Sequence, residues 1–423
     1  MNNPSIADYV IARLADLRIQ HALEICLAVS LTFLNSSAAQ EAMAAAPAPV
    51  AYVYVQTSKG VVLYHAAANG TLTRVSGSPF HTVGEMVGSN GKYLFSLGTH
   101  LIHVYPIASN GAIMAQISQI NTQSHSGSDC GATTYGVLDH TGQELYILIN
   151  GRVLGPACSA YQSFRVDEAT GALTFLGATQ QEGAMALLAI TANDKFAYST
   201  NSSGSGGGQF IGFAREASGA LGQLSFSETD PTPPSPYVSI AWIVRADPGN
   251  HLAVALGSVK DWASPEQQFA PVRLGSYTVE SQGDISTTNT WEEMPVPDVG
   301  PTLMTLSPSG KFLAVAGTKP FFPNCGWCAD NIDIEVSLKG TGLQLFHFNG
   351  SQPITHFGKV LTTAPIDQVQ WDNNNHLYAV SEHAGKLYVY TVTPASITEV
   401  PGSPYAIENP RIVNSNGLIV VPK

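Results

Sequence analysis

Charged side chains are scarce in this sequence. Only 12% of its 423 residues are Asp, Glu, Lys or Arg, and 19 basic residues stand against 31 acidic ones, which gives a formal net charge of −12. A surface that binds nucleic acid needs a basic field, so we expect no nucleic-acid partner. The hydrophobic fraction of 44% is large enough to build a core, which excludes a disordered chain.

The usual catalytic signatures are also missing. The sequence has no G-x-S-x-G elbow, no H-E-x-x-H motif, no Walker sequence and no G-x-G-x-x-G. The glycine-rich run 204–208 lacks the strand–helix setting of a phosphate site, so we interpret it as a flexible loop. We therefore expect neither a cofactor nor a metal, and no catalytic motif in the sequence indicates a reaction.

The first fifty residues differ from the rest. Basic residues precede an apolar run over 25–34, and small residues follow it. This order is typical of a secretory signal, and the run is too short to span a bilayer. We predict a signal over 1–39, an Ala/Pro-rich linker over 40–50, and a periplasmic or secreted mature chain without a membrane span. A buried or disordered N-terminal helix is the alternative.

From residue 51 onward, a turn followed by a short strand recurs. Each turn contains Gly, Asn or Asp and leads into aromatic or β-branched residues, which indicates strands. The copies are 90–95, 141–146, 193–198, 249–254, 309–314 and 374–379. Because helical periodicity is absent and the repeat is long, we predict an all-β fold, a seven-bladed β-propeller over 51–423.

The two ends of the chain decide how such a ring closes. The N-terminal unit, 51–75, begins with the second strand of a blade and has no inner strand of its own. We predict that a C-terminal inner strand, Pro410–Asn414, completes this blade and removes the open sheet edges. The run Leu418–Val421 then has no place, and it leaves eight blades as an alternative.

Connections differ in length between the two faces of the predicted ring. In a four-stranded antiparallel blade, the turns after the first and third strands lie on one face, and these are short. The other face carries longer connections such as 151–160, 201–209 and 318–341. Long loops on a rigid scaffold are where binding and catalysis concentrate, so we expect the functional site on this loop-rich face.

Four cysteines remain when Cys26, in the predicted signal, is set aside. The topology places Cys130 and Cys158 on the loop-rich face of one blade, and Cys325 and Cys328 form a C-x-x-C pair in one loop. An even count suits an oxidising compartment. We predict the disulfides Cys130–Cys158 and Cys325–Cys328; a redox-active pair or half of a zinc site are alternatives for the C-x-x-C.

Several segments resemble one known family. The segments 307–315, 386–390 and 170–173 are similar to a YVTN-type repeat that reads roughly S-P-D-G-x-x-L-Y-V, then V-Y-x-hydrophobic, then G-x-L. This repeat is typical of the lactonase-type seven-bladed propellers, which include 6-phosphogluconolactonase and carboxymuconate-cyclising enzymes. The resemblance covers about residues 51–415. It implies the propeller fold with C-terminal closure and, as an expectation, chemistry on a lactone.

The sequence departs from this family where its enzymes act. Members that open lactones tend to carry His or Arg near the start of several inner strands, as in P-R-H-x-x-x-H-P. In this chain Ala241-Trp242-Ile243 stands where that motif begins, Asp247 replaces its last His, and Asp367 lies near an expected Arg. Lactone opening needs an activated water and a positive group for the oxyanion. The inner strands offer few such groups.

Two functions therefore remain. The favoured one is an exported, non-catalytic propeller that binds a small molecule (lactone or carbohydrate-like) or a protein through its loop-rich face. The other is a lactone hydrolase or isomerase with a diverged site, which would need an acid, a cation and a base at the channel mouth. The candidate ligand-binding residues expected there are Glu85, Trp242, Asp367, Gln368 and Arg411. We expect a monomer.

Overall fold

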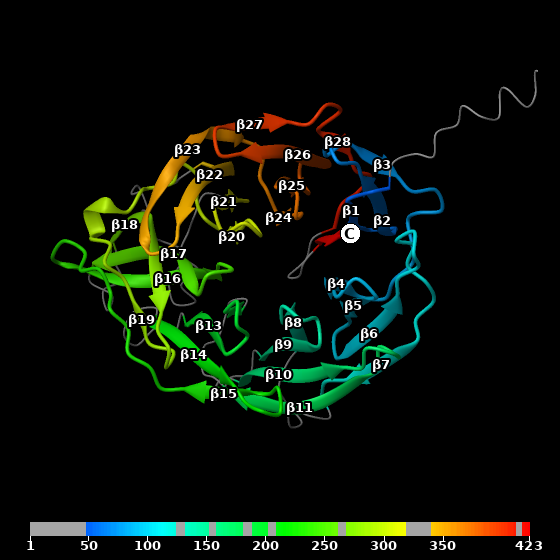
Figure 1. Ribbon diagram of the computed structural model, residues 1–423, viewed down its shortest axis with the longest axis horizontal. Helices are drawn as coiled ribbons and strands as arrows, with labels where there is room; N and C mark the ends of the chain where they lie inside the picture. Colours follow the sequence, from blue (N-terminus) through cyan, green and yellow to red (C-terminus); the bar gives the residue numbers. More distant parts are fainter. Residues whose placement is uncertain are drawn as a thin grey trace, which may run out of the picture. The chain divides into compact units, whose positions relative to one another are not determined.

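The computed structural model describes residues 48–123, 132–151, 158–180, 188–201, 209–260, 268–318, 340–411 and 417–423. The compact unit that contains the strands is Pro49–Lys423. It consists of seven small antiparallel sheets set in a ring (Figure 1). The all-β, seven-bladed propeller is therefore confirmed. The predicted signal over 1–39 lies outside the described residues.

The first four blades are four-stranded sheets. In order from the inner to the outer strand, blade 1 consists of β29 (Leu418–Pro422), β1 (Ala51–Thr57), β2 (Gly60–Ala66) and β3 (Leu72–Arg74). Blade 2 consists of β4 (Glu85–Ser89), β5 (Tyr93–Leu97), β6 (Leu101–Pro106) and β7 (Ser118–Asn121). Blade 3 consists of β8 (Ala132–Leu138), β9 (Glu144–Gly151), β10 (Cys158–Val166) and β11 (Leu173–Gln180). Blade 4 consists of β12 (Ala189–Ile190), β13 (Phe196–Asn201), β14 (Gln209–Arg215) and β15 (Leu221–Leu224).

The remaining blades follow the same order. Blade 5 consists of β16 (Tyr237–Ala246), β17 (His251–Lys260), β18 (Gln268–Val279) and β19 (Ile285–Ser286), and the short 3-10 helix η2 (Trp291–Glu293) follows it. Blade 6 consists of β20 (Leu303–Leu306), β21 (Phe312–Gly317), β22 (Gly342–Asn349) and β23 (Gln352–Thr362). Blade 7 consists of β24 (Gln368–Trp371), β25 (His376–Ser381), β26 (Lys386–Thr393) and β27 (Ser396–Glu399), and β28 (Tyr405–Ala406) also pairs with β26.

The ring closes with a different C-terminal segment from the one predicted. Leu418–Pro422 (β29) pairs antiparallel with β1, with Leu418 opposite Val55, so the prediction of Pro410–Asn414 is wrong. Within that range Pro410 makes only an isolated bridge with Thr57. An inner strand packs against a neighbouring blade on each side, which favours a continuous apolar run, and proline has no N–H for the ladder. Leu418–Val421 meets that need, and no eighth blade forms in the described part of the chain.

A capped turn joins the inner strand of several blades to the second strand. In blade 7 the buried Asp372 accepts hydrogen bonds from the backbone N of Asn374 and of His376, both at 2.8 Å, and from the Tyr378 hydroxyl at 2.9 Å. In blade 5, Asp247 accepts from the backbone N of His251 at 2.6 Å. Side-chain capping of this kind explains why the turn motif recurs through the sequence.

Adjacent blades interlock through the residue that begins each second strand. In blade 2 this residue is Tyr93, whose hydroxyl donates to the carbonyl of Ala169 in blade 3 at 2.9 Å. Its ring lies beneath Gly171, where φ is +70° and an added Cβ would come within 2.7 Å of the ring. Only glycine fits this left-handed position under an aromatic ring. The Gly-rich turns of the sequence therefore create the seams between blades.

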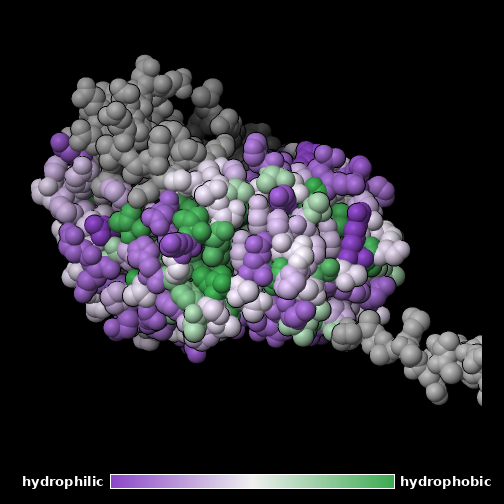
Figure 2. Space-filling model, turned by 90° about the horizontal axis from the view of Figure 1, so that it is seen from above, coloured by the Kyte–Doolittle hydropathy of each residue, from purple (hydrophilic) through white to green (hydrophobic). Residues whose placement is uncertain are grey.

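The outer rim is mostly hydrophilic on the side seen in Figure 2, with a smaller hydrophobic area. Phe357 and Leu361 of β23 and Ile397 of β27 are half-buried and pack against one core cluster. Outer strands are half-buried because they form the edge of each blade, whereas the second strand β25 is buried along its whole length.

Candidate functional site

A pocket of about 570 Å³ lies on the loop-rich face, between blades 1 and 2. Its lining comes from the β1–β2 turn, the connection that leads into β4, the β5–β6 turn, the start of β8 and the segment before β29. We call it the Glu85 pocket. Its main polar residues are Gln56, Lys59, His81, Thr82, Glu85, Thr99, Thr133 and Arg411.

Two of the five predicted ligand-binding residues line the Glu85 pocket. Glu85 is the first residue of β4, where its backbone lies opposite Leu97, and its side chain is half-buried. Arg411 is exposed, and its backbone N donates to the carbonyl of Gln56 at 3.2 Å. The pocket therefore brings an acid and a cation from opposite ends of the chain to one place.

Two residues of this pocket that the sequence analysis did not identify have buried polar atoms without a described hydrogen-bond partner. Gln56 is only 7% exposed, and its Oε1 has no hydrogen-bond partner in the described part of the chain. The buried Oγ1 of Thr82 is likewise without a described partner. A buried polar atom without a partner costs about 1–3 kcal/mol, so a ligand that supplied the missing bond would gain from this arrangement. The available clue was a glutamine at the end of an otherwise apolar run, Ala51–Val55.

A second cavity of about 930 Å³ adjoins the first. We call it the His383 pocket, and it shares Ser58, Lys59 and Arg411 with the Glu85 pocket. Its other polar side chains include Glu382, His383 and Glu408, from the β25–β26 turn and the segment after β28. Among the described lining residues, Lys59 and Arg411 are therefore the only charged ones that the two pockets share.

Asp367 lies behind the wall of the His383 pocket, and Gln368 follows it at the start of β24. The Asp367 carboxylate accepts a hydrogen bond from the backbone N of Glu382 at 2.7 Å. Burial raises the pKa of Asp367, and the hydrogen bond from Glu382 acts against this rise. Gln368 begins β24 and is half-buried opposite Val380. Neither residue is among the described residues that line the two pockets, so their predicted ligand contacts stay predictions.

Trp242 occupies a bulge in β16, where the register shifts between Ala241 and Ile243. Its indole lies against Gly257, where an added Cβ would come within 1.9 Å of Nε1. It is not among the described residues of either pocket. Nearby on β16, Arg245 donates from Nε to the carbonyl of Met304 at 2.8 Å, and burial lowers the pKa of Arg245 to about 10. This arginine ties blade 5 to blade 6.

The cysteine predictions fall mostly beyond the described residues. Cys130, Cys325 and Cys328 are all outside them. Cys158 begins β10, where its backbone lies opposite Gly151. Both disulfides therefore stay predictions. In the described part of the chain, no group of three or more His, Cys, Asp or Glu could hold a metal.

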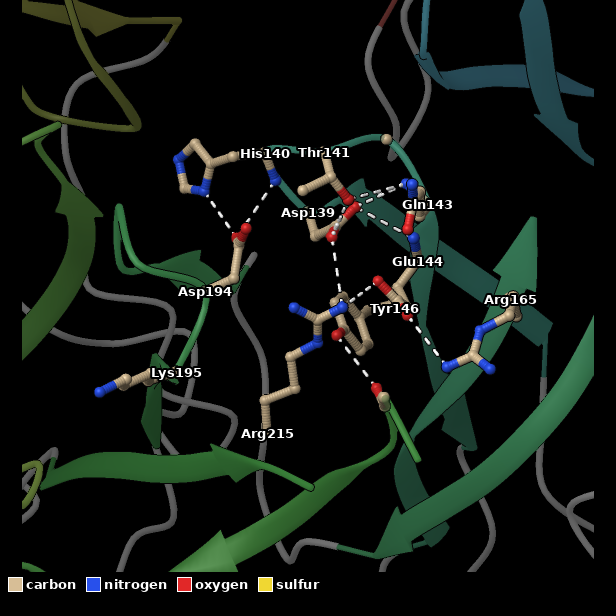
Figure 3. A network of polar contacts seen from close by, with 12 residues as sticks. Asp139, His140, Thr141, Gln143, Glu144, Tyr146, Arg165, Asp194, Lys195 and Arg215 are labelled. Carbon is tan, nitrogen blue, oxygen red and sulfur yellow. Dashed lines mark hydrogen bonds and ion pairs between the residues drawn. The ribbon is translucent and has the colours of Figure 1, made fainter. Parts of the chain in front are cut away.

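A buried charge network occupies the opposite, short-turn face, between blades 3 and 4 (Figure 3). Glu144 begins the second strand of blade 3, a position that an aromatic or histidine residue holds in five of the other six blades: Tyr93, Phe196, His251, Phe312 and His376. The Glu144 side chain is 3% exposed, and its carboxylate binds Arg215 of blade 4 and Arg165, the latter at 3.3 Å. The Asp139 carboxylate lies 3.5 Å from Arg215.

The pKa values of the two carboxyl groups in this network shift in opposite directions. Burial, together with a hydrogen bond to Asp139, raises the pKa of Glu144 above its ordinary value. Burial also acts to raise the pKa of Asp139, but the hydrogen bonds that its carboxylate accepts, first from the Glu144 backbone, outweigh burial and lower that pKa. Glu144 is therefore the weaker acid of the pair and Asp139 the stronger one.

The architecture defines the class: a seven-bladed β-propeller with two adjoining pockets on the loop-rich face. Within that class, its fold is that of lactonase-type propellers, as the resemblance implied. A 6-phosphogluconolactonase-like structure from Bacteroides fragilis has a TM-score of 0.53 and 12% identity, covering 88% of this chain and 97% of that one. A periplasmic gluconolactonase of Pseudomonas aeruginosa has a TM-score of 0.52 and 14% identity, covering 88% and 99%.

A third structure, a 6-phosphogluconolactonase-like protein from Bacteroides uniformis, has a TM-score of 0.52 and 12% identity, covering 85% of this chain and 97% of that one. Neither a protein-family model nor a curated protein matches the sequence. Identities at this level show a common fold, and they transfer no activity. The described residues form no helix that is long and apolar enough to cross a membrane.

Proposed function

We propose that this propeller binds a small, hydroxyl-rich acidic molecule, such as a sugar acid or its lactone, in the Glu85 pocket. The observation that carries the proposal is the buried Gln56, which lines this polar pocket and whose Oε1 has no described hydrogen-bond partner. A glutamine oxygen accepts hydrogen bonds, and the nearby Thr82 hydroxyl both donates and accepts. Sugar hydroxyl groups supply both kinds of partner.

The charges of the pocket favour a ligand that also carries an acidic group. Arg411 is exposed and makes no ion pair with any described residue, and Lys59, whose described ion pair is the exposed one with Glu408, also lines the pocket. Since the chain has a formal net charge of −12, two cations in one lining are a local exception. Arginine recognises carboxylates through two parallel hydrogen bonds, which fixes the orientation of the ligand.

The second candidate function is hydrolysis of a sugar lactone in the same pocket. Glu85, His81 and Arg411 line one cavity, which supplies the acid, base and cation that lactone opening requires. In such a reaction His81 or Glu85 would activate a water, and Arg411 would stabilise the oxyanion. A fold neighbour is a gluconolactonase, so glucono-δ-lactone is the first compound to test.

We also propose that the protein acts outside the cytoplasm, as a periplasmic or secreted protein. The support is the order of basic, apolar and small residues within 1–39 and the even number of remaining cysteines. Analysis of the N-terminus of protein recovered from its own cells tests this. A mature end near residue 40 supports export, and an intact N-terminus in the cytoplasmic fraction contradicts it.

Isothermal titration with gluconate and glucono-δ-lactone tests ligand binding, and release of acid from the lactone tests hydrolysis. Replacing Gln56 with Leu should weaken gluconate binding about tenfold, since the ligand loses one buried hydrogen bond. Gln162→Leu is the matched control, because Gln162 is also buried with an Oε1 that has no described partner but lies outside the pocket. Equal effects of the two substitutions, or no binding to the unmodified protein, would reject the site.

A further inference from the structure

The Glu85 and His383 pockets form one continuous surface. Both are lined by Ser58 and Lys59, in the turn between β1 and β2, and by Arg411 before β29. Their volumes are about 570 Å³ and 930 Å³. Each pocket alone has the volume of a cavity for a drug-sized ligand, about 300–1,000 Å³. A single sugar acid is smaller than such a ligand, so it occupies only part of the combined space. A longer molecule can extend from one pocket into the other past the two shared cations.

The charge at the junction is available to a ligand. Lys59 pairs with Glu408 at 3.3 Å, but their side chains are 61% and 72% exposed. An ion pair this exposed is weak, so a ligand anion can replace Glu408 at little cost. Arg411 makes no ion pair with any described residue. Besides Glu408, each pocket is lined by another carboxylate, Glu85 in the first and Glu382 in the second, and both can accept from hydroxyl groups.

The wall of the His383 pocket is held in place before any ligand arrives. The backbone N of Glu382 donates to the Asp367 carboxylate at 2.7 Å, and the backbone N of Ala384 donates to the Ser381 hydroxyl at 3.1 Å. These bonds fix the turn that presents His383. A fixed wall lowers the entropic cost of binding. Asp367 is therefore a positioning residue for this pocket.

We infer that the natural ligand is an acidic saccharide of at least two units, with its carboxylate at Lys59 and Arg411 and a second sugar in the His383 pocket. This inference rests on the proposed function, since one unit occupies the Glu85 pocket. It adds the size of the ligand, the position of its charge and the role of His383, whose exposed imidazole can donate a hydrogen bond to the second unit.

Three probes separate these features in titrations with the full chain: gluconate (short and anionic), lactose (long and neutral) and lactobionate, in which galactose is joined to gluconate. Lactobionate should bind about tenfold tighter than gluconate, because the second unit gains one or two hydrogen bonds. It should also bind about tenfold tighter than lactose, which lacks the carboxylate. Replacing His383 with Ala should remove the advantage over gluconate and leave gluconate binding unchanged.

His356→Ala is the matched control, because His356 is also exposed but lies on the outer strand β23. If gluconate binds and lactobionate binds no tighter, the extended site is refuted while the proposed function stands. Equal binding of lactose and lactobionate would refute the anionic junction. A lactobionate advantage that survives His383→Ala would refute the place of the second unit. If none of the probes binds, the proposed function and the extended site both fail.

Discussion

Arg215 neutralises two buried carboxylates, so its removal is the most informative perturbation of the scaffold. The side chains of Asp139 and Glu144 are 0% and 3% exposed, whereas that of Arg215 is 25% exposed. Removing one partner of a buried ion pair costs about 3–5 kcal/mol. Since water reaches part of Arg215, we expect the lower end, about 3 kcal/mol, for Arg215→Met. Methionine keeps most of the side-chain volume, so the loss reports on charge.

Urea unfolding followed by tryptophan fluorescence at several pH values measures this cost. Arg165→Met is the matched control: Arg165 binds the same Glu144 carboxylate but is 51% exposed, so we expect a loss of at most about 1 kcal/mol. Both substitutions make the same chemical change at a partner of Glu144, and Arg215 differs in being more buried and in also pairing with Asp139.

The pH dependence of the Arg215→Met effect provides the refuting test. The pKa of Glu144 is raised in the folded state, so the folded protein binds this proton more tightly than the unfolded chain does. Stability from this group therefore falls as pH rises above the ordinary glutamate value of 4.5. Loss of Arg215 should raise that pKa further, so the destabilisation should be larger at pH 7 than at pH 5. A cost below about 1 kcal/mol, or one that is equal at both pH values, would refute the reasoning.

Three other features of the structure lead to measurable effects. Gly171→Ala should lower the free energy of unfolding by about 1–3 kcal/mol, measured in urea, because its left-handed backbone lies against Tyr93. An unchanged urea midpoint would contradict the claim that this position requires glycine. Asp367→Asn should raise the urea midpoint at pH 7 but not at pH 3, because burial raises the pKa of Asp367 and its ionisation opposes folding; a lower midpoint at pH 7 would contradict this. Protein from an oxidising compartment should show no free thiol before reduction; alkylation of Cys130 or Cys158 under those conditions would reject that bridge.

The fold was predictable because its determinants are local. Turns such as 309–314 and 374–379 carry their capping residues and strand residues in one short segment, and each blade repeats this signal. The choice of the closing strand, in contrast, depends on contacts with residues that are distant in the sequence. Pro410–Asn414 and Leu418–Val421 both follow the last repeat, and only the burial of both sides of the inner strand selects the apolar run.

The candidate site was only partly predictable for the same reason. Glu85 could be placed on the loop-rich face, because it stands where the repeat predicts the start of an inner strand. Arg411 was placed there through the predicted strand Pro410–Asn414, whereas in the structure it lines the pocket from the segment before β29. Gln56 belongs to a second strand, and the repeat gives no indication that its side chain lies in a cavity. The pocket exists because blades 1 and 2 pack with their turns against the segment before β29.

The sequence by itself determined the number of strands in a blade, the loop-rich face and the two ends that meet. Only the tertiary structure decided which polar side chains lose their contact with water. Gln56 and Glu144 are ordinary polar residues in the chain, yet both are at least nine-tenths buried once neighbouring blades pack together. Burial depends on residues that are distant in the sequence, and it is burial that leaves the Gln56 Oε1 without a described protein donor and Glu144 dependent on Arg215.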